Sequence, residues 1–299
     1  MRELVIISGK GGTGKTSVTA AFARLAESSV LADCDVDAAD LHLVVAASQG
    51  ETHEFSARKR ATIDPDKCTL CGACLEHCRF GAVDLDPPRI DPFACEGCGL
   101  CSRLCPAGAI RCEQVVNGEW LLAETPWGPL VHAHLGVAED NSGKLVSLVR
   151  EEARKVAQKR GLQTVIVDGA PGIGCPVIAS LTGATLVLVV TEPTVSGRHD
   201  LGRVLQLVHH FGLPFAVCVN KYDVNAQIAA EITAEAEAAG ALFVRAVRYD
   251  PGVTQAMVRG GSVVDGRAGL LSEGVSADLM ALWQRTAATL DRCERDRQA

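Results

Sequence analysis

The stretch Leu4–Thr16 decides the fold of this chain, because an apolar run leads directly into a glycine-rich loop. Leu4–Ile7 reads Leu-Val-Ile-Ile, which predicts a buried strand. Gly9–Thr16 then reads Gly-Lys-Gly-Gly-Thr-Gly-Lys-Thr and matches the phosphate-loop pattern G-x-x-x-x-G-K-[ST] in full. Helical spacing follows over Ser17–Glu27. Strand, loop and helix in this order favour a phosphate-binding loop over an ordinary glycine-rich turn.

Each residue type in this loop has a physical task. Glycines let backbone N–H groups turn toward an anion, and the N-terminal end of the following helix adds partial positive charge. We expect Lys15 to reach the β- and γ-phosphates of a nucleotide and the Thr16 hydroxyl to ligate Mg²⁺. The loop therefore predicts that ATP or ADP binds together with Mg²⁺.

Further apolar runs alternate with segments of helical length, and this predicts an α/β fold with a mostly parallel sheet flanked by helices. Asp35 and Asp168 follow two of these runs, where a carboxylate can hold Mg²⁺ or its water shell. A lone Asp after a strand is usually a helix cap or turn former, but the complete phosphate loop favours the magnesium interpretation. Val115–Leu122 is expected to form a hairpin around an Asn-Gly turn. The remaining runs are Val30–Ala32, Thr164–Val167, Thr185–Val190, Phe215–Val219 and Leu242–Val247.

Cysteine is concentrated in one segment. Of 13 cysteines, eight lie between Cys68 and Cys105. Such density is typical of small secreted disulfide scaffolds, whereas in a cytosolic chain of this length it indicates metal ligands. The segment is also duplicated: a shift of 27 residues superposes the first four cysteines on the last four and Gly81-Ala82-Val83 on Gly108-Ala109-Ile110. A repeated half-unit with pseudo-twofold symmetry explains these matches.

The spacing C-x₂-C-x₂-C-x₃-C occurs twice and resembles the bacterial two-cluster ferredoxin run, in which the fourth cysteine of each run ligates the other cluster. This implies two [4Fe–4S] clusters. Structural zinc is the alternative, but a zinc site made of two CxxC pairs needs no third cysteine at the same spacing. The expected ligands are Cys68, Cys71, Cys74 and Cys105 for one cluster, and Cys78, Cys95, Cys98 and Cys101 for the other. We therefore expect an inserted ferredoxin-like domain over residues 64–112, between the two parts of an ATPase domain at 1–63 and 113–299.

Several motifs together resemble the MinD/ParA class of P-loop ATPases, which also includes the nitrogenase iron protein. Lys10 gives the loop the deviant Walker A form of that class, and Asp33–Asp37 resembles its second acidic motif. Asp168–Gly172 resembles the switch motif, and Val219–Asp223 resembles the strand end that reads the base. With the insertion included, the match is to MinD-superfamily ATPases that carry a ferredoxin domain.

The resemblance implies an ATP-sandwich homodimer that hydrolyses ATP slowly without its partner. In this class Lys10 contacts phosphate held by the partner subunit, Asp35 orients the attacking water, and Asp168 holds Mg²⁺ indirectly. Lys10, Lys15 and Asp35 are then the expected catalytic residues, and Thr16, Asp35 and Asp168 are expected to hold Mg²⁺. Arg248 stands where the class often has proline. The implied nucleotide-binding residues are Gly9, Lys10, Gly11, Gly12, Thr13, Gly14, Lys15, Thr16, Ser17, Asn220 and Lys221.

Composition excludes other classes of protein. The formal net charge of −7 over 299 residues, with no basic block, argues against nucleic acid as a partner. No apolar run approaches the ~20 residues of a membrane-spanning helix, so we expect a cytoplasmic protein without membrane insertion. The C-terminal segment places Leu279, Leu282, Trp283, Thr286 and Leu290 on one helical face, which is expected to pack on the body of the protein.

Three functions fit these features. The first is an ATPase whose nucleotide cycle is coupled to electron transfer through the two clusters to an unidentified redox partner. The second is an ATP-dependent assembly or carrier protein that delivers iron–sulfur clusters or a metal cofactor to a client. The third is a MinD/ParA-like positioning ATPase. Cys175 lies seven residues after Asp168, an offset at which the nitrogenase iron protein has a cluster ligand, although a core thiol is the simpler interpretation.

Overall fold

The computed structural model of the chain describes residues 1–26, 28–136, 142–259, 264 and 273–298. The chain divides into two compact units. The first contains Met1–Thr52, Trp120–His134 and the segment from Ser142 onward, and the second is built around His53–Glu119. The cysteine segment 64–112 lies inside the second unit.

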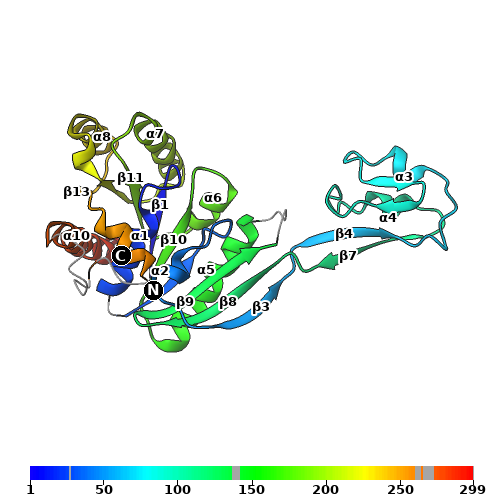
Figure 1. The fold of residues 1–299 in the computed structure, drawn as a ribbon, viewed down its shortest axis with the longest axis horizontal. Helices are drawn as coiled ribbons and strands as arrows, with labels where there is room; N and C mark the ends of the chain where they lie inside the picture. Colours follow the sequence, from blue (N-terminus) through cyan, green and yellow to red (C-terminus); the bar gives the residue numbers. More distant parts are fainter. Residues whose placement is uncertain (27, 137–141, 260–263, 265–272, 299) are drawn as a thin grey trace. The chain divides into compact units, whose positions relative to one another are not determined.

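A sheet of nine strands, counted among the described residues, forms the centre of the first unit. The strands are β1 (Arg2–Ser8), β2 (Ser29–Asp33), β3 (Glu51–Phe55), β8 (Gly118–Thr125), β9 (Gly128–Leu135), β10 (Thr164–Pro171), β11 (Leu186–Thr191), β12 (Phe215–Asn220) and β13 (Val244–Val247). Their order is β13, β12, β11, β1, β10, β2, β9, β8, β3 (Figure 1). Each apolar run that was predicted to form a strand contributes to this sheet.

Neighbouring strands from β13 to β9 run parallel, so the predicted α/β class with a mostly parallel sheet is confirmed. In register, Asp168 of β10 pairs with Asp33 of β2 on one side and with Ile6 of β1 on the other. The carboxyl ends of these strands thus meet at one edge of the sheet, and that edge is where ligands bind in such folds.

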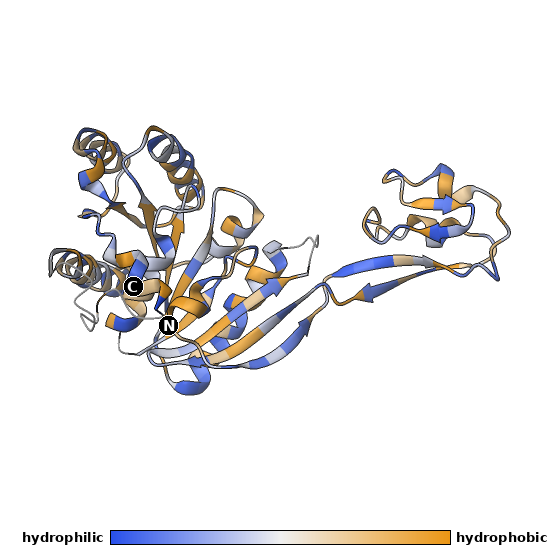
Figure 2. Cartoon of the chain, viewed as in Figure 1, coloured by the Kyte–Doolittle hydropathy of each residue, from blue (hydrophilic) through white to orange (hydrophobic). Residues whose placement is uncertain are grey.

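Helices cover both faces of the sheet (Figure 1). Leu4 and Ile6 of β1 form a buried cluster with Phe22 of α1 and Leu282 of α10. The opposite face is covered by α5, α6, α7 and α8, which pack on β2, β10, β11 and β12. In Figure 2 the central strands are mainly hydrophobic, while the helices carry both polar and apolar stripes. The helices are α1 (Lys15–Leu25), α2 (Leu41–Val44), α5 (Ser142–Arg160), α6 (Cys175–Leu181), α7 (Val195–His210), the 3₁₀ helix η1 (Tyr222–Val224), α8 (Ala226–Ala238), α9 (Gly252–Val258) and α10 (Glu273–Gln298).

The C-terminal helix α10 packs on the body as predicted. Leu279, Leu282, Thr286 and Leu290 are buried, and the Trp283 ring lies 5.0 Å from that of Phe22. Within the described ranges, none of the helices combines the length and apolar character needed to cross a bilayer.

The expected hairpin around Asn117 is wrong. β7 (Ile110–Val115) pairs with β4 (Arg58–Ile63) in a separate two-stranded sheet, while β8 joins the nine-stranded sheet. Asn117 is buried, its N–H donates to Phe55 O over 2.9 Å, and its Oδ1 accepts from the Ala57 N–H at 2.8 Å. Its polar groups therefore bond to another segment of the chain instead of closing a turn.

The second unit repeats one small motif twice. Its elements are β4, α3 (Ala73–Glu76), β5 (Val83–Leu85), β6 (Pro88–Ile90), α4 (Leu100–Leu104) and β7. The short helices α3 and α4 each follow a left-handed glycine, Gly72 with φ 81° and Gly99 with φ 73°. These two glycines are equivalent in the sequence repeat.

Backbone pairing in this unit has pseudo-twofold symmetry. Asp64 N donates to Ala109 O and Asp91 N donates to Ala82 O, both over 2.7 Å. A shift of 27 residues takes Asp64 to Asp91 and Ala82 to Ala109, so each bond is the image of the other. The strand pairs follow the same rule, because Ile63 pairs with Ile110 and Val83 pairs with Ile90. Each half of the repeat is therefore completed by the other half.

Candidate functional site

The phosphate loop joins the end of β1 to the start of α1. Gly12 and Gly14 have positive φ angles of 81° and 93°, which glycine adopts without strain. A Cβ on Gly14 would lie 2.2 Å from Asn220 Nδ2, so this position has no room for a side chain. Asn220 itself donates from Nδ2 to Thr13 O over 2.8 Å. The loop is thus held against the end of β12.

Lys15 is buried among carboxylates at the edge of the sheet. Its side chain is 6% exposed, and its Nζ lies 3.0 Å from Asp168 Oδ1 and 3.5 Å from Asp35 Oδ2. Burial lowers the pKa of Lys15, but the surrounding carboxylates outweigh this and leave the pKa above its ordinary value. The Asp168 and Asp35 carboxylates thus hold the ammonium at the end of the phosphate loop.

Asp168 organises the start of α1. Its Oδ2 accepts from the Thr16 hydroxyl over 2.8 Å, and its Oδ1 accepts from the Thr19 hydroxyl over 2.7 Å. The carboxylate is 1% exposed. The structure thus brings together Lys15, Thr16 and Asp168. Asp35 contacts this group at Lys15, whose Nζ lies 3.5 Å from Asp35 Oδ2. Hydroxyl and carboxylate oxygens are the ligand types that Mg²⁺ takes beside substrate phosphates.

Asp33, the first residue of the acidic motif at 33–37, is fully buried beside this group. It accepts hydrogen bonds from the backbone N–H groups of Asp35 and Leu41, both over 3.1 Å. Burial, with the nearby Asp168 charge, raises the pKa of Asp33 to about 8. Asp33 thus holds the backbone of the segment that carries Asp35. Its position at the end of β2 is the sequence feature that points to this edge of the sheet.

Lys10 points away from Lys15 and toward the start of α7. Its Nζ lies 2.8 Å from Glu192 Oε1 and 2.9 Å from the Ser196 hydroxyl. Lys221 Nζ lies 3.2 Å from the other oxygen of the same carboxylate and 3.1 Å from Gly12 O. Sequence reasoning missed Glu192, although it directly follows β11 and so lies at the ligand-binding edge.

A cavity of about 150 Å³ opens beside the phosphate loop. Ser17, Asn220 and Lys221 contribute to its lining, as do Arg248 and Tyr249 from the segment after β13. Arg248 Nε donates to Asp278 Oδ2 of α10 over 2.6 Å, so the residue that replaces proline is anchored at the cavity wall. The polar loop residues and apolar side chains such as Leu279 suit a base and sugar next to the phosphates.

The cysteines of the second unit line two cavities. One is lined by Cys68, Cys71, Cys74 and Cys105, which are three cysteines of the first run and the last cysteine of the second. The other is lined by Cys78, Cys95, Cys98 and Cys101, with Cys74 also at its wall. Apolar side chains, including Ile63, Val83, Ile90 and Ile110, pack around the thiols. The fold thus gathers the same two sets of four sulfur donors that the spacing predicts.

The other cysteines lie elsewhere. Cys218 and Cys293 are buried in the core of the first unit, where free cysteine packs as a small apolar side chain. The expectation of a core thiol at Cys175 is wrong, because this residue begins α6 and is exposed. Cys112 is half-buried, with its Sγ 3.7 Å from Gly97 O beside the second cysteine run.

Comparison with known proteins identifies relatives of the chain. The family model of the CobQ/CobB/MinD/ParA nucleotide binding domain matches residues 4–263. The uncharacterized protein MJ0578 of Methanocaldococcus jannaschii is 37% identical over 227 residues, which cover 75% of this chain and 79% of that protein. A second protein of that organism, MJ0579, is 31% identical over 98 residues, which cover 33% of this chain and 35% of that protein.

Solved structures agree with the fold. The septum site-determining protein MinD of Pyrococcus horikoshii, complexed with Mg-ADP, aligns with a TM-score of 0.58 at 16% identity and 95% coverage of both chains. The MinC:MinD cell division complex of Aquifex aeolicus aligns with a TM-score of 0.57 at 17% identity and 96% coverage of both chains. Because the sequence identities are this low, these structural alignments show a common fold and nothing beyond it.

Proposed function

This chain belongs to the CobQ/CobB/MinD/ParA nucleotide-binding family, and we propose that it is an ATPase whose cycle is coupled to electron transfer through two [4Fe–4S] clusters. The observation that carries the proposal is the pair of cysteine-lined cavities, each combining three thiols of one run with the fourth thiol of the other. A phosphate loop and an iron–sulfur module in one chain favour coupling between nucleotide and redox chemistry.

The nucleotide half is supported by the chemistry of the donors. Lys15 offers a buried ammonium at the end of the phosphate loop, beside the Asp168 and Asp35 carboxylates, which suits the β- and γ-phosphates. The Thr16 hydroxyl would hold Mg²⁺ directly, while Asp168 and Asp35 would hold its water shell. When bound, Mg²⁺ neutralises charge on the phosphates. We also assign Asp35 the task of orienting an attacking water, and its carboxylate 3.5 Å from Lys15 Nζ at the same edge supports this.

Lys10 supports a cycle that needs two copies of the chain. Within one chain its ammonium is engaged by Glu192 and Ser196. We place it on the phosphate of a partner subunit's nucleotide in a closed homodimer, where it would stabilise charge in the transition state. Closing the dimer then requires Lys10 to leave Glu192, so the two arrangements define an open and a closed state.

The redox half is supported by the cysteine sets. Cys68, Cys71, Cys74 and Cys105 would hold one cluster, and Cys78, Cys95, Cys98 and Cys101 the other. When bound, such clusters carry single electrons at potentials set by the hydrogen bonds and solvent around the sulfurs. The left-handed Gly72 and Gly99 start α3 and α4 beside the thiols, where their neighbours' N–H groups can turn toward sulfur.

Two other functions use the same parts. An assembly or carrier protein would bind its cluster through an incomplete and labile ligand set, and the two complete sets of cysteines favour resident clusters instead. A positioning ATPase is the function nearest to the solved MinD relatives, and it would leave the clusters without a redox role. The family comparisons support the nucleotide-binding part common to all three functions, whereas electron transfer is supported by the cysteines alone.

The deciding experiment measures cluster content and coupling in the same sample. Anaerobically purified protein is expected to contain about eight irons and eight sulfides per chain, the content of two cubane clusters. Reduced protein is then mixed with a small-molecule electron acceptor, and cluster oxidation is followed by absorbance with ATP, with ADP and without nucleotide. We expect the oxidation rate to depend on the nucleotide in the native chain and not in Lys15→Ala.

Each competing function predicts a different result. Full iron content with a nucleotide-independent oxidation rate contradicts coupling and favours a positioning ATPase. Loss of iron to a chelator or to an apo-ferredoxin during ATP turnover favours the carrier function. Cys175→Ser is the matched cysteine control, because this exposed thiol lies outside both cavities and its loss is expected to leave iron content unchanged.

A further inference from the structure

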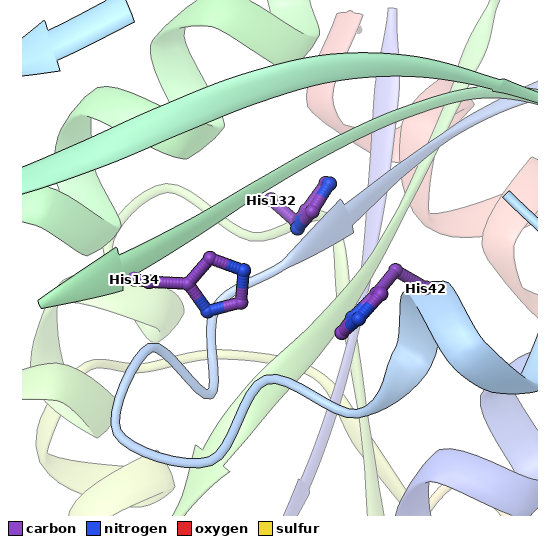
Figure 3. Close-up of side chains that lie close together, drawn as sticks. All are labelled: His42, His132 and His134. Carbon is purple, nitrogen blue, oxygen red and sulfur yellow. The ribbon is translucent and has the colours of Figure 1, made fainter. Parts of the chain in front are cut away.

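Three histidines of the first unit face one another at the edge of the sheet next to the acidic strand end. His132 and His134 lie two residues apart on β9, and His42 lies on the short helix α2 (Figure 3). Because side chains alternate along a strand, His132 and His134 share one face of β9. β9 runs beside β2, the strand that leads to α2, so the topology brings together residues about 90 positions apart in sequence.

The three rings form a compact group. One ring nitrogen from each histidine lies within 4.8 Å of the other two. The rings of His42 and His132 are nearly parallel with centroids 5.0 Å apart, and His134 meets both edge-on at 5.7 and 5.3 Å. Figure 3 shows the imidazoles converging from two elements on a common space.

The group is also incompletely satisfied. His132 is only 5% exposed, and its Nδ1 is buried with no hydrogen-bond partner among the described residues. The Nδ1 atom of His42 is likewise buried with no hydrogen-bond partner among the described residues. A buried ring nitrogen without a partner costs free energy, so such atoms in a native protein require an explanation. A ligand that accepts electron pairs from several imidazoles would satisfy them at once.

The geometry points to a mononuclear metal site in which His42, His132 and His134 bind a divalent transition-metal ion of the zinc class. Neutral imidazole is a common ligand for Zn²⁺, and three histidines leave a fourth tetrahedral position for water or another ligand. His42 and His134 are half-buried, and this gives the ion a path from solvent. The site uses none of the residues proposed to bind nucleotide or iron–sulfur clusters.

The position of the site connects it to the acidic strand end. His42 follows Leu41, whose backbone N–H donates to Asp33 Oδ2 over 3.1 Å. A metal ion shared by His42 and β9 would therefore cross-link α2 to the sheet, directly after the segment that carries Asp35.

The test is zinc binding by the full-length protein with its iron retained. Chelator-treated protein is dialysed against Zn²⁺, and zinc and iron per chain are measured by mass spectrometry. We expect the native chain to hold about one zinc more than His132→Gln or His134→Gln, with equal iron in all samples. His210→Gln is the matched control, because His210 is exposed on α7 and should keep the native zinc content.

Two further measurements identify the ligands and separate binding from folding. Co²⁺ in the same site should give the spectrum of nitrogen and oxygen ligands without thiolate charge-transfer bands. Zn²⁺ should raise the thermal midpoint of the native chain and of His210→Gln but not of His134→Gln. His134 is chosen because its ring is half-buried, so its replacement should disturb folding less than replacement of the buried His132. Equal zinc content in native and His134→Gln protein, or thiolate bands with Co²⁺, would overturn the assignment.

Discussion

Lys10 Nζ lies 2.8 Å from Glu192 Oε1, so the lysine that distinguishes this phosphate loop is paired with a carboxylate of its own chain. The Lys10 side chain is 31% exposed, and pairs of this kind contribute about 0.2–1 kcal/mol. The contact is therefore weak enough to be exchanged for another. That exchange is the basis of the first two predictions.

Glu192→Gln should favour the ATP-bound dimer. Removing the carboxylate charge frees Lys10 at a gain of less than about 1 kcal/mol per chain. Because a homodimer exchanges two such pairs, the dimer becomes tighter by at most roughly 30-fold. Sedimentation velocity with ATP and with ADP measures the dissociation constant. Arg198→Gln, which removes the exposed ion pairs of Arg198 on α7 with Glu231 and Glu235 on α8, is the control. A dimer weakened by Glu192→Gln would show that Glu192 supports closure.

Lys10→Ala should lower ATP hydrolysis much more than ATP binding. A group that reaches phosphate only in the closed dimer acts in the transition state and adds little to binding by the single chain. Steady-state kinetics and calorimetry with a non-hydrolysable ATP analogue give the two quantities. Hydrolysis at the native rate would disprove the cross-subunit role.

Lys15→Ala and Thr16→Ala should abolish hydrolysis and leave iron content unchanged. Both residues lie in the first unit, where they contact Asp168, whereas the cysteine-lined cavities belong to the second unit. Phosphate release and iron per chain are measured on the same preparation. Iron loss in either variant would mean that the two units do not fold independently.

Gly14→Ala should prevent nucleotide binding, because its Cβ would lie 2.2 Å from Asn220 Nδ2 at a φ of 93°. The loop would have to move away from β12 or displace the Asn220 side chain. Gly202→Ala is the matched control, since no atom lies within 4 Å of its Cβ in α7. That control should be neutral or stabilising by up to about 1 kcal/mol. Fluorescent-nucleotide titration compares the two variants, and native affinity in Gly14→Ala would contradict the contact.

Arg150→Met should destabilise the first unit by about 3–5 kcal/mol. Arg150 donates to Glu3 Oε2 over 2.7 Å in a buried pair, and it also donates to Ala179 O and Thr182 O. The substitution leaves the two carbonyls without their donor and leaves Glu3 with Arg154, which donates to Oε2 over 2.6 Å, in place of two arginines. Arg160→Met, which loses only an exposed pair with Glu124, should cost less than about 1 kcal/mol. Urea denaturation measures both, and equal losses would contradict the role of burial.

Sequence patterns predicted the parts of this molecule that are encoded locally. The phosphate loop and the alternating strands follow from patterns within short stretches, and the structure places them accordingly. The division of the cysteines into two sets came from the resemblance to the ferredoxin run, and the same two sets line the two cavities. Residues 64–112 were predicted as the insertion, whereas the compact second unit is built around His53–Glu119. The difference lies in β4 and β7, which pair with each other and extend beyond the cysteines that marked the segment.

Features that depend on tertiary contacts could not be predicted. The Asn117 turn signal failed because a distant strand supplies its hydrogen bonds. Glu192 reaches Lys10 because β11 lies beside β1, and nothing in either local sequence specifies that pair. His42 meets His132 only because β9 lies beside β2. In each case the missing information is which strands are neighbours, and hydrophobic periodicity does not report it.

The reciprocal backbone bonds of the second unit, from Asp64 to Ala109 and from Asp91 to Ala82, have a consequence for its ancestry. Neither half of the repeat can close its own cavity, because each borrows its last cysteine and its partner strand from the other. A single ancestral half could have formed these cavities only by pairing with a second copy of itself. Fusion of two copies would then have turned an intermolecular interface into an intramolecular one and freed each half to diverge.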